Sequence, residues 1–245
     1  MDKKYAVLSY SGGMDSTGLL LRLLAQDFSV HALSFFYGQK HNVEIDRSMD
    51  VVSLLEDKGM HVDHKIIDLS RAMSLFDSAL TDPDVEIPDG HYEEENMKLT
   101  VVPNRNAIFS SLIYGYALSL AQRKECEVPI ALGVHSGDHA IYPDCRPEFY
   151  TALEAAFKLG NWNSEKVHYY LPYLDGDKFT ILDQAVFDCE KLGVDFEEIF
   201  RNTNTCYKPN IHGESCGKCG SCTERLEAFK KVGIEDPVKY QEKEN

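Results

Sequence analysis

The sequence predicts an α/β protein in which helices cover both faces of a doubly wound, mostly parallel sheet. Short apolar runs alternate with segments whose apolar residues recur at helical spacing, and a glycine-rich turn follows the first run. Successive strands joined by helices are expected to run parallel, because each helix carries the chain back to the end where the next strand begins. The 245 residues are enough to bury a full core around such a sheet.

The first third of the chain supplies three strands and two helices. Leucines 19, 20, 23 and 24 recur at helical spacing, and Gly59 provides a typical helix C-cap. In chain order we expect a strand at 5–9, a helix at 15–26, a strand at 30–36, a helix at 42–57 and a strand at 64–69.

The alternation then breaks and resumes. Residues 70–98 are rich in proline, glycine and acidic side chains, which indicates a lid or a solvated loop. After them we expect a helix at about 106–122, a strand at 129–134, a polar loop at 136–149 and helices at about 147–158 and 179–192. The sequence shows neither a repeat nor a low-complexity linker, so 1–245 is predicted to be one domain that includes a metal-binding element at about 203–232.

The charge of the chain argues against broad binding to nucleic acids. Lysine and arginine number 25 against 40 aspartates and glutamates, which gives a formal net charge of −15. Such an acidic protein repels a phosphate backbone at long range, so we expect no direct nucleic-acid partner.

The apolar runs and the cysteines bear on the compartment. Every apolar run is far shorter than the ~20 residues that cross a bilayer, and residues 1–5 lead into no apolar signal segment. The seven cysteines are an odd number, and four of them fall within 206–222, which favours reduced thiols that bind metal over disulfides. We expect a cytoplasmic protein with no membrane partner.

A glycine-rich loop, Ser-Gly-Gly-Met-Asp-Ser at 11–16, joins the first strand to the first helix. Glycine allows a tight turn close to an anion, and the N–H groups that open the helix attract phosphate. The loop lacks the lysine of a Walker loop and the Gly-x-Gly-x-x-Gly spacing of dinucleotide sites. It resembles the PP-loop of ATP pyrophosphatases. This resemblance implies that the pyrophosphate end of ATP is held by Ser11, Gly12, Gly13, Met14, Asp15, Ser16 and Thr17.

The carboxylate in this loop has a separate role. Asp15 repels phosphate, so it is expected either to cap the helix or to help bind Mg²⁺. A serine and glycine turn with an aspartate cap, and no ligand, is the alternative interpretation.

Four cysteines have spacing that brings their thiolates around one ion: Cys206, Cys216, Cys219 and Cys222. Four thiolates are typical of tetrahedral Zn²⁺ in a closed structural site. A Cys-x₂-Cys-x₂-Cys run also opens the bacterial iron–sulfur motif, but that motif continues with a fourth cysteine and a proline that are missing here. His212 is expected to be a bystander.

Together, the PP-loop and these cysteines resemble the 7-cyano-7-deazaguanine synthase family of the PP-loop ATP pyrophosphatase superfamily, whose fold is adenine nucleotide alpha hydrolase-like. Further segments fit the same family, and the stretch at 142–149, Tyr-Pro-Asp-Cys-Arg-Pro-Glu-Phe, is the most specific. The others lie at 36–41 with Glu44, at 102–106, at 133–134, at 192–195 and at 219–225.

The resemblance implies an adenylating, nitrile-forming carbon–nitrogen ligase of queuosine precursor biosynthesis. The carboxylate of 7-carboxy-7-deazaguanine would attack ATP, ammonia would displace AMP to give the amide, and a second ATP would drive the amide to the nitrile. ATP, Mg²⁺ and Zn²⁺ are the implied cofactors. The partners would be small-molecule substrates and a second copy of the chain in a homodimer.

The resemblance also implies roles for single residues. Asp15, Arg105, Asp138 and Lys178 are the candidate catalytic residues. Arg105 and Arg146 carry a fixed positive charge suited to a carboxylate or a phosphate, and Lys178 is a candidate phosphate contact. Acidic side chains would pair with the guanine-like edge, aromatic rings would stack on it, and His41 is a candidate proton shuttle. The candidate substrate-binding residues are Tyr142, Asp144, Arg146, Glu148 and Phe149. For each of these residues alone, a helix cap or a surface ion pair remains the alternative.

Departures from the family pattern keep related functions open. Asn104 stands where the family has glycine, although asparagine tolerates the left-handed region, and Gly18 stands where threonine is usual. A relative that stops at the amide, or that joins the activated carboxylate to another amine, is therefore an alternative. A zinc-ribbon nucleic-acid-binding module is an alternative from another class, but it would leave the glycine loop without a purpose.

Overall fold

The computed structural model describes residues 3–39, 43–82, 84–85, 99–137 and 142–242. Its centre is a five-stranded sheet in the order β3-β2-β1-β4-β5, in which every strand runs parallel to its neighbours. The strands are β1 (Lys4–Ser9), β2 (Phe28–Phe36), β3 (Asp63–Asp68), β4 (Val128–Ala131) and β5 (Val167–Tyr170). The predicted fold class is confirmed. That all 245 residues form one domain stays a prediction.

The five predicted helices agree with the structure to within a few residues, and further elements had no predicted counterpart. The helices are α1 (Met14–Ala25), α2 (Val43–Asp57), α3 (Ser70–Met73), α4 (Arg105–Lys124), α5 (Pro147–Gly160), α6 (Lys178–Leu192), α7 (Phe196–Arg201) and α8 (Gly220–Val232). Among these are β5, a run of only four residues that includes a histidine, the short helices α3 and α7, and helix α8, which lies in the segment predicted only as a metal-binding element. The excursion at 70–98 begins with α3, and residues 86–98 lie outside the described part of the chain.

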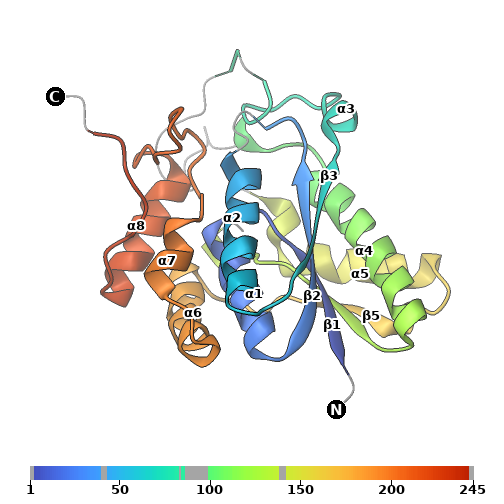
Figure 1. Ribbon diagram of the computed structural model, residues 1–245. Coiled ribbons are helices and arrows are strands. Elements are labelled where there is room, and N and C mark those ends of the chain that lie inside the picture. Colours follow the sequence, from blue (N-terminus) through green and yellow to red (C-terminus); the bar gives the residue numbers. More distant parts are fainter. Residues whose placement is uncertain (1–2, 40–42, 83, 86–98, 138–141, 243–245) are drawn as a thin grey trace.

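Helices cover both faces of the sheet, as expected for a doubly wound protein (Figure 1). An apolar core fills the space on each face. In β1, Ala6 and Leu8 face a core shared with α1, α2, α6, α7 and α8, whereas Val7 faces a second core shared with α4 and α5. This alternation follows from the two-residue period of a strand. None of the described helices is long and apolar enough to cross a membrane.

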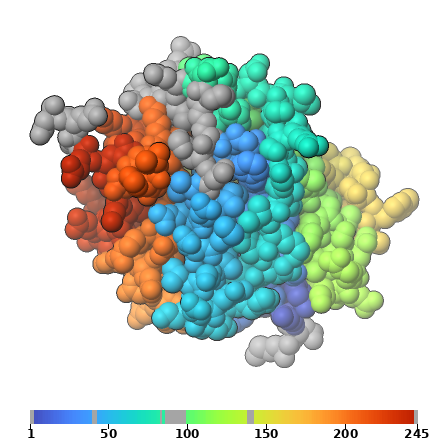
Figure 2. All heavy atoms as spheres, turned by 45° about the horizontal axis from the view of Figure 1, so that its top comes forward, coloured from blue at the N-terminus to red at the C-terminus, as the bar shows by residue number. Residues whose placement is uncertain are grey.

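The sheet order predicts a ligand-binding site at the carboxyl ends of β1 and β4. These two strands are neighbours, but the chain continues from β1 toward β2 and from β4 toward β5, so the connections that follow them diverge. Ligands of doubly wound sheets bind at such a switch point. Figure 2 turns this end forward and shows N-terminal residues (blue) between the C-terminal segment (orange to red) and the α4 region (green).

Candidate active site

The loop after β1 leaves the start of α1 available to an anion. Gly13 is the N-cap of α1, and the structure describes no side chain that caps this helix. The hydroxyls of Ser11 and Ser16 lie 3.0 Å apart, and Ser11 Oγ accepts a hydrogen bond from the Gly13 N–H at 3.2 Å. Uncapped N–H groups and two hydroxyls at a helix N-terminus form a phosphate-binding arrangement.

Gly12 is required by the packing behind this loop. Its φ of 77° lies in the left-handed region. A β-carbon here would lie 2.5 Å from the carbonyl oxygen of Glu44 and 2.6 Å from the amide nitrogen of Ser48. Only glycine allows the first turns of α2 to lie against the loop.

The other predicted loop residues have different surroundings. The side chains of Met14 and Thr17 are fully buried, and Thr17 lies 3.5 Å from the hydroxyl of Tyr10. Ser11, Gly13, Asp15 and Ser16 line the cavity described below.

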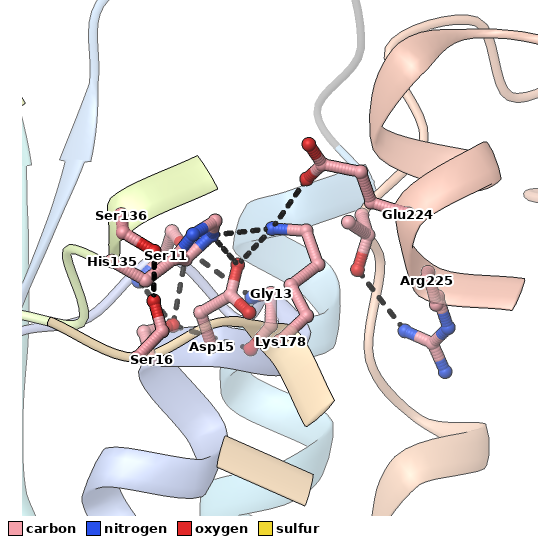
Figure 3. A network of polar contacts seen from close by, with 11 residues as sticks. Ser11, Gly13, Asp15, Ser16, His135, Ser136, Lys178, Glu224 and Arg225 are labelled. Carbon is pink, nitrogen blue, oxygen red and sulfur yellow. Dashed lines mark hydrogen bonds and ion pairs between the residues drawn. The ribbon is translucent and has the colours of Figure 1, made fainter. Parts of the chain in front are cut away.

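Lys178 joins three segments of the chain beside the loop (Figure 3). Its Nζ lies 2.9 Å from Asp15 Oδ2, 2.8 Å from His135 Nε2 and 3.6 Å from Glu224 Oε2. Lys178 is only 5% exposed and is the first residue of α6, where Asp177 and Thr180 form a capping box that fixes the start of the helix. A rigid, buried ammonium group is therefore held at the rim of the phosphate-binding loop.

This cluster sets the protonation state of Asp15. Burial alone would raise the pKa of its carboxyl, but Lys178 and His135 outweigh burial and hold that pKa below its ordinary value. Asp15 is therefore ionised at neutral pH, and its Oδ1 is a buried atom without a hydrogen-bond partner among the described residues.

A cavity of about 260 Å³ opens next to the loop. Its walls come from several segments that are far apart in the sequence. They include Ser11, Gly13, Asp15, Tyr37, Glu44, Arg105, Cys145, Tyr150 and Asn204.

Arg105 gives the cavity a fixed positive charge. It is the first residue of α4, and its guanidinium lies 5.9 Å from the ring centre of Tyr37, a cation–π distance. Asn104 before it has φ 59° and ψ 13°, so the asparagine adopts the left-handed turn that the sequence comparison with the family predicted.

The predicted substrate-binding residues lie near this cavity's wall rather than in its described lining. Tyr142 is buried and its hydroxyl contacts Thr100 Oγ1 at 2.7 Å, while Arg146 and Glu148 are exposed at the start of α5. Asp144 and Phe149 are half-buried. From this stretch, Cys145 and Tyr150 reach the cavity instead. Asp138 and His41 lie outside the described residues, so every role assigned to these residues stays a prediction.

The four cysteines form one compact cluster. Their sulfur atoms all lie within 4.8 Å of one another, and Cys216 Sγ is 4.0 Å from Cys222 Sγ. A tetrahedral ion with bonds of about 2.3 Å requires sulfurs a little under ~4 Å apart, so the donor set fits a metal ion. Backbone N–H groups of Lys208 and Cys216 donate to Cys206 Sγ at 3.2 Å, as expected around a thiolate ligand.

A buried arginine fastens this cluster to the fold. Arg225 is 1% exposed and donates to both carboxylate oxygens of Asp236, at 2.8 and 2.9 Å. It also donates to Thr203 Oγ1, Thr205 Oγ1 and the carbonyl of Phe200. Glu224, the preceding residue of α8, faces Lys178, so the helix that begins at the metal cluster also reaches the phosphate-binding loop.

Three of these site residues had no assigned role in the sequence analysis. His135 follows the Gly-Val pair at the carboxyl end of β4, which is the position where a switch-point residue is expected. Glu44 and Glu224 belong to segments that fit the family pattern, but neither had an assigned role, because each reaches the site only through the packing of a distant helix.

Comparison with known proteins identifies the family. The family described as "Queuosine biosynthesis protein QueC" matches residues 5–233. The chain is 46% identical over 238 residues to 7-cyano-7-deazaguanine synthase 2 of Colwellia psychrerythraea, which covers 97% of this chain and 99% of that protein. It is 44% identical over 236 residues to 7-cyano-7-deazaguanine synthase of Methanoregula boonei, with 96% and 99% covered.

Solved structures are more distantly similar. A 4-thiouridine synthetase in complex with RNA and ATP is 15% identical, with a TM-score of 0.48, and the match covers 94% of this chain and 51% of that one. Likeness at this level decides nothing about function. The family match over residues 5–233 and the full-length relatives show that this chain belongs to the QueC family of queuosine biosynthesis proteins, whose relatives named above are 7-cyano-7-deazaguanine synthases.

Proposed function

We propose that this chain converts 7-carboxy-7-deazaguanine and ammonia into 7-cyano-7-deazaguanine at the expense of ATP. The observation that carries the proposal is an uncapped helix N-terminus and Arg105 at one cavity, in a member of this family. The N–H groups suit the pyrophosphate that leaves on adenylation, and the guanidinium suits the carboxylate that is adenylated. The chain is thus an ATP-dependent carbon–nitrogen ligase.

The reaction requires the same leaving group twice. The carboxylate attacks the α-phosphate of ATP, and ammonia then displaces AMP to give the amide. The amide oxygen attacks a second ATP, and loss of AMP leaves the nitrile. Ser11, Ser16, the α1 N–H groups and Lys178 stabilise the charge that grows on each departing pyrophosphate, while Arg105 orients the carboxylate.

Mg²⁺ fits the carboxylate at the loop. The buried Oδ1 of Asp15 lacks a hydrogen-bond partner within the described part of the chain, so it is suited to a cation held beside the phosphates. When bound there, Mg²⁺ supplies positive charge against the pyrophosphate. Lys178 keeps Asp15 ionised and therefore ready to act as a ligand.

The metal of the cysteine cluster is proposed to be Zn²⁺ with a structural role. Four thiolates complete a tetrahedral shell and leave no position for a substrate.

The homodimer proposed for this family member has a candidate contact on α5 and the residues after it, because Leu159 is 91% and Trp162 is 90% exposed. Two large apolar side chains so close together are typical of an interface.

The proposal is tested by incubating the protein with MgATP, ammonium and 7-carboxy-7-deazaguanine, and following AMP and the base by mass spectrometry. We expect the nitrile, with two AMP released for each base converted. An amide with one AMP would mean that the enzyme stops halfway. No AMP from folded, metal-loaded protein would overturn the proposed function.

A further inference from the structure

Glu44 places a carboxylate at the cavity, and none of the proposed reaction steps uses it. It lies in the first turn of α2 and lines the cavity together with Ser11 and Gly13. The close approach of its backbone to Gly12 fixes this position, since its carbonyl oxygen would touch any β-carbon there. The carboxylate interacts electrostatically with Arg105, which lines the same cavity.

The surroundings of Glu44 leave its carboxylate available. Among the described residues, neither a hydrogen bond nor an ion pair involves its side chain. Arg105 of α4 is the charged group that acts on it, and Tyr37, at the end of β2, is the titratable neighbour that shares this arginine. Burial, opposed by Arg105, raises the pKa of Glu44 to about 7. A carboxylate with this pKa both accepts and releases protons at neutral pH.

The chemistry of amide formation needs such a group. Ammonia is present mainly as ammonium at neutral pH, and ammonium has no lone pair with which to attack a carbonyl carbon. A proton must leave before attack, and a second proton must leave the nitrogen as AMP departs. The other carboxylate in the described lining, Asp15, is occupied by Lys178 and has a lowered pKa, which makes it a poor base.

We propose that Glu44 is a catalytic residue that binds ammonium and takes its proton as the nitrogen attacks the adenylated carboxylate. The Glu44 carboxylate accepts a proton from ammonium, and the released ammonia forms the C–N bond. Glu44 passes this first proton to water. The C–O bond to AMP then breaks, AMP leaves with the electron pair, and the nitrogen gives its surplus proton to the regenerated Glu44 carboxylate. This inference rests on the proposed function.

Glu44→Gln separates this step from adenylation. ATP–pyrophosphate exchange driven by 7-carboxy-7-deazaguanine reports adenylation and needs no ammonia. Amide formation reports the ammonia step. We expect the loss of ammonia-dependent activity at pH 7 to exceed the loss of exchange by about 100-fold, the usual contribution of a general base.

Two further measurements test whether Glu44 acts by removing a proton from ammonium. Hydroxylamine is largely uncharged at neutral pH, so the defect of E44Q should shrink at least ~10-fold when it replaces ammonium. The defect should also shrink as the pH rises and free ammonia becomes plentiful. Glu44→Asp should retain part of the ammonia-dependent activity, and Glu56→Gln, an exposed glutamate on the same helix, should match wild type.

Equal losses of exchange and amide formation in E44Q would overturn the inference and make Glu44 a substrate-binding residue. An unchanged ammonia step, or a defect that neither hydroxylamine nor high pH relieves, would overturn it as well. Failure of the proposed function looks different, because the wild-type protein itself would then show no exchange that depends on the base.

Discussion

At the scale of single residues, Lys178 is the group on which the site's charges depend. Its ammonium is buried and stands between Asp15 and Glu224, with His135 beside it. Removing one member of a buried ion pair leaves the other without compensation, which costs more than the pair contributes when intact. Lys178 therefore determines both how the loop at Asp15 is held and how the site is charged.

Lys178→Met should lower both activity and stability. Without the ammonium, base-dependent ATP–pyrophosphate exchange should fall about 100-fold or more. The free energy of unfolding at pH 7 should fall by about 1–3 kcal/mol, because Asp15 keeps its charge in a largely buried place. Lys231→Met removes an exposed pair with Asp177 and should cost less than about 1 kcal/mol.

The stability difference should depend on pH in one direction. Burial tends to raise the pKa of Asp15, but in the wild type Lys178 and His135 keep it below its ordinary value. Ionised Asp15 therefore stabilises the fold above about pH 4, and this contribution is lost as the pH falls through the lowered pKa. Urea unfolding of wild type and K178M from pH 7 to pH 3 should show the gap closing. A gap that is constant with pH would contradict this account.

At the scale of elements, Gly18 governs how closely α1 packs on α6. A β-carbon at Gly18 would lie 2.5 Å from Cγ2 of Ile181. The departure from the threonine usual in the family is thus a feature of helix packing, and the substrate cavity is not lined by this residue. The neighbouring side chain is β-branched and has little freedom to move away.

Gly18→Ala should therefore destabilise the protein, although alanine favours helices. We expect a loss of about 1–3 kcal/mol in urea unfolding, because overpacking outweighs the gain in propensity. The loss should be smaller in an Ile181→Leu background, which moves the branch away. Gly115→Ala on α4 is the control: a β-carbon there meets nothing within 4 Å, so this change should be neutral or stabilising by up to about 1 kcal/mol.

The cysteine cluster acts as a second structural element. Metal removal should lower the melting temperature, because the ion joins the segment at Cys206 to the start of α8. Cys219→Ser should lose the metal and melt with the chelated wild type, whereas Cys126→Ser, a half-buried cysteine outside the cluster, should keep it. Metal analysis beside calorimetry checks this. Equal melting temperatures after proven metal loss would rule out a structural site.

At the scale of the whole molecule, the exposed apolar side chains of Leu159, at the end of α5, and Trp162, just after it, predict how copies associate. Leu159→Glu should convert the proposed homodimer to a monomer in light scattering. Trp162 is the only tryptophan of the chain, so its fluorescence should shift to longer wavelength at the same time. Ile211→Glu changes a side chain that is 95% exposed near the metal cluster and should leave the dimer intact. A wild-type monomer would contradict the proposal.

The features predictable from the sequence are those written in contiguous residues. The PP-loop, the four cysteines and the strand–helix alternation each occupy one segment, so local pattern is enough to find them. The partners of the loop come from helices far away in the chain: Glu44 through α2, Lys178 through α6 and Glu224 through α8. Lys178 was proposed from its place at the start of a helix. Glu44 and Glu224 lie in segments that fit the family pattern, but a segment match does not show which of its residues reaches the cavity. β5 was missed for a similar reason, since four residues are too few to show a period.

The position of Glu224 and Arg225 has a consequence for biosynthesis. The ribosome makes the glycine-rich loop before the other segments of the site, but the Lys178–Glu224 contact requires α8. Arg225 in turn waits for Asp236, and the bridge of Ser215 to Tyr240 is made by nearly the last described residues. A nascent chain therefore carries an incomplete site until α8 and Asp236 have both been made.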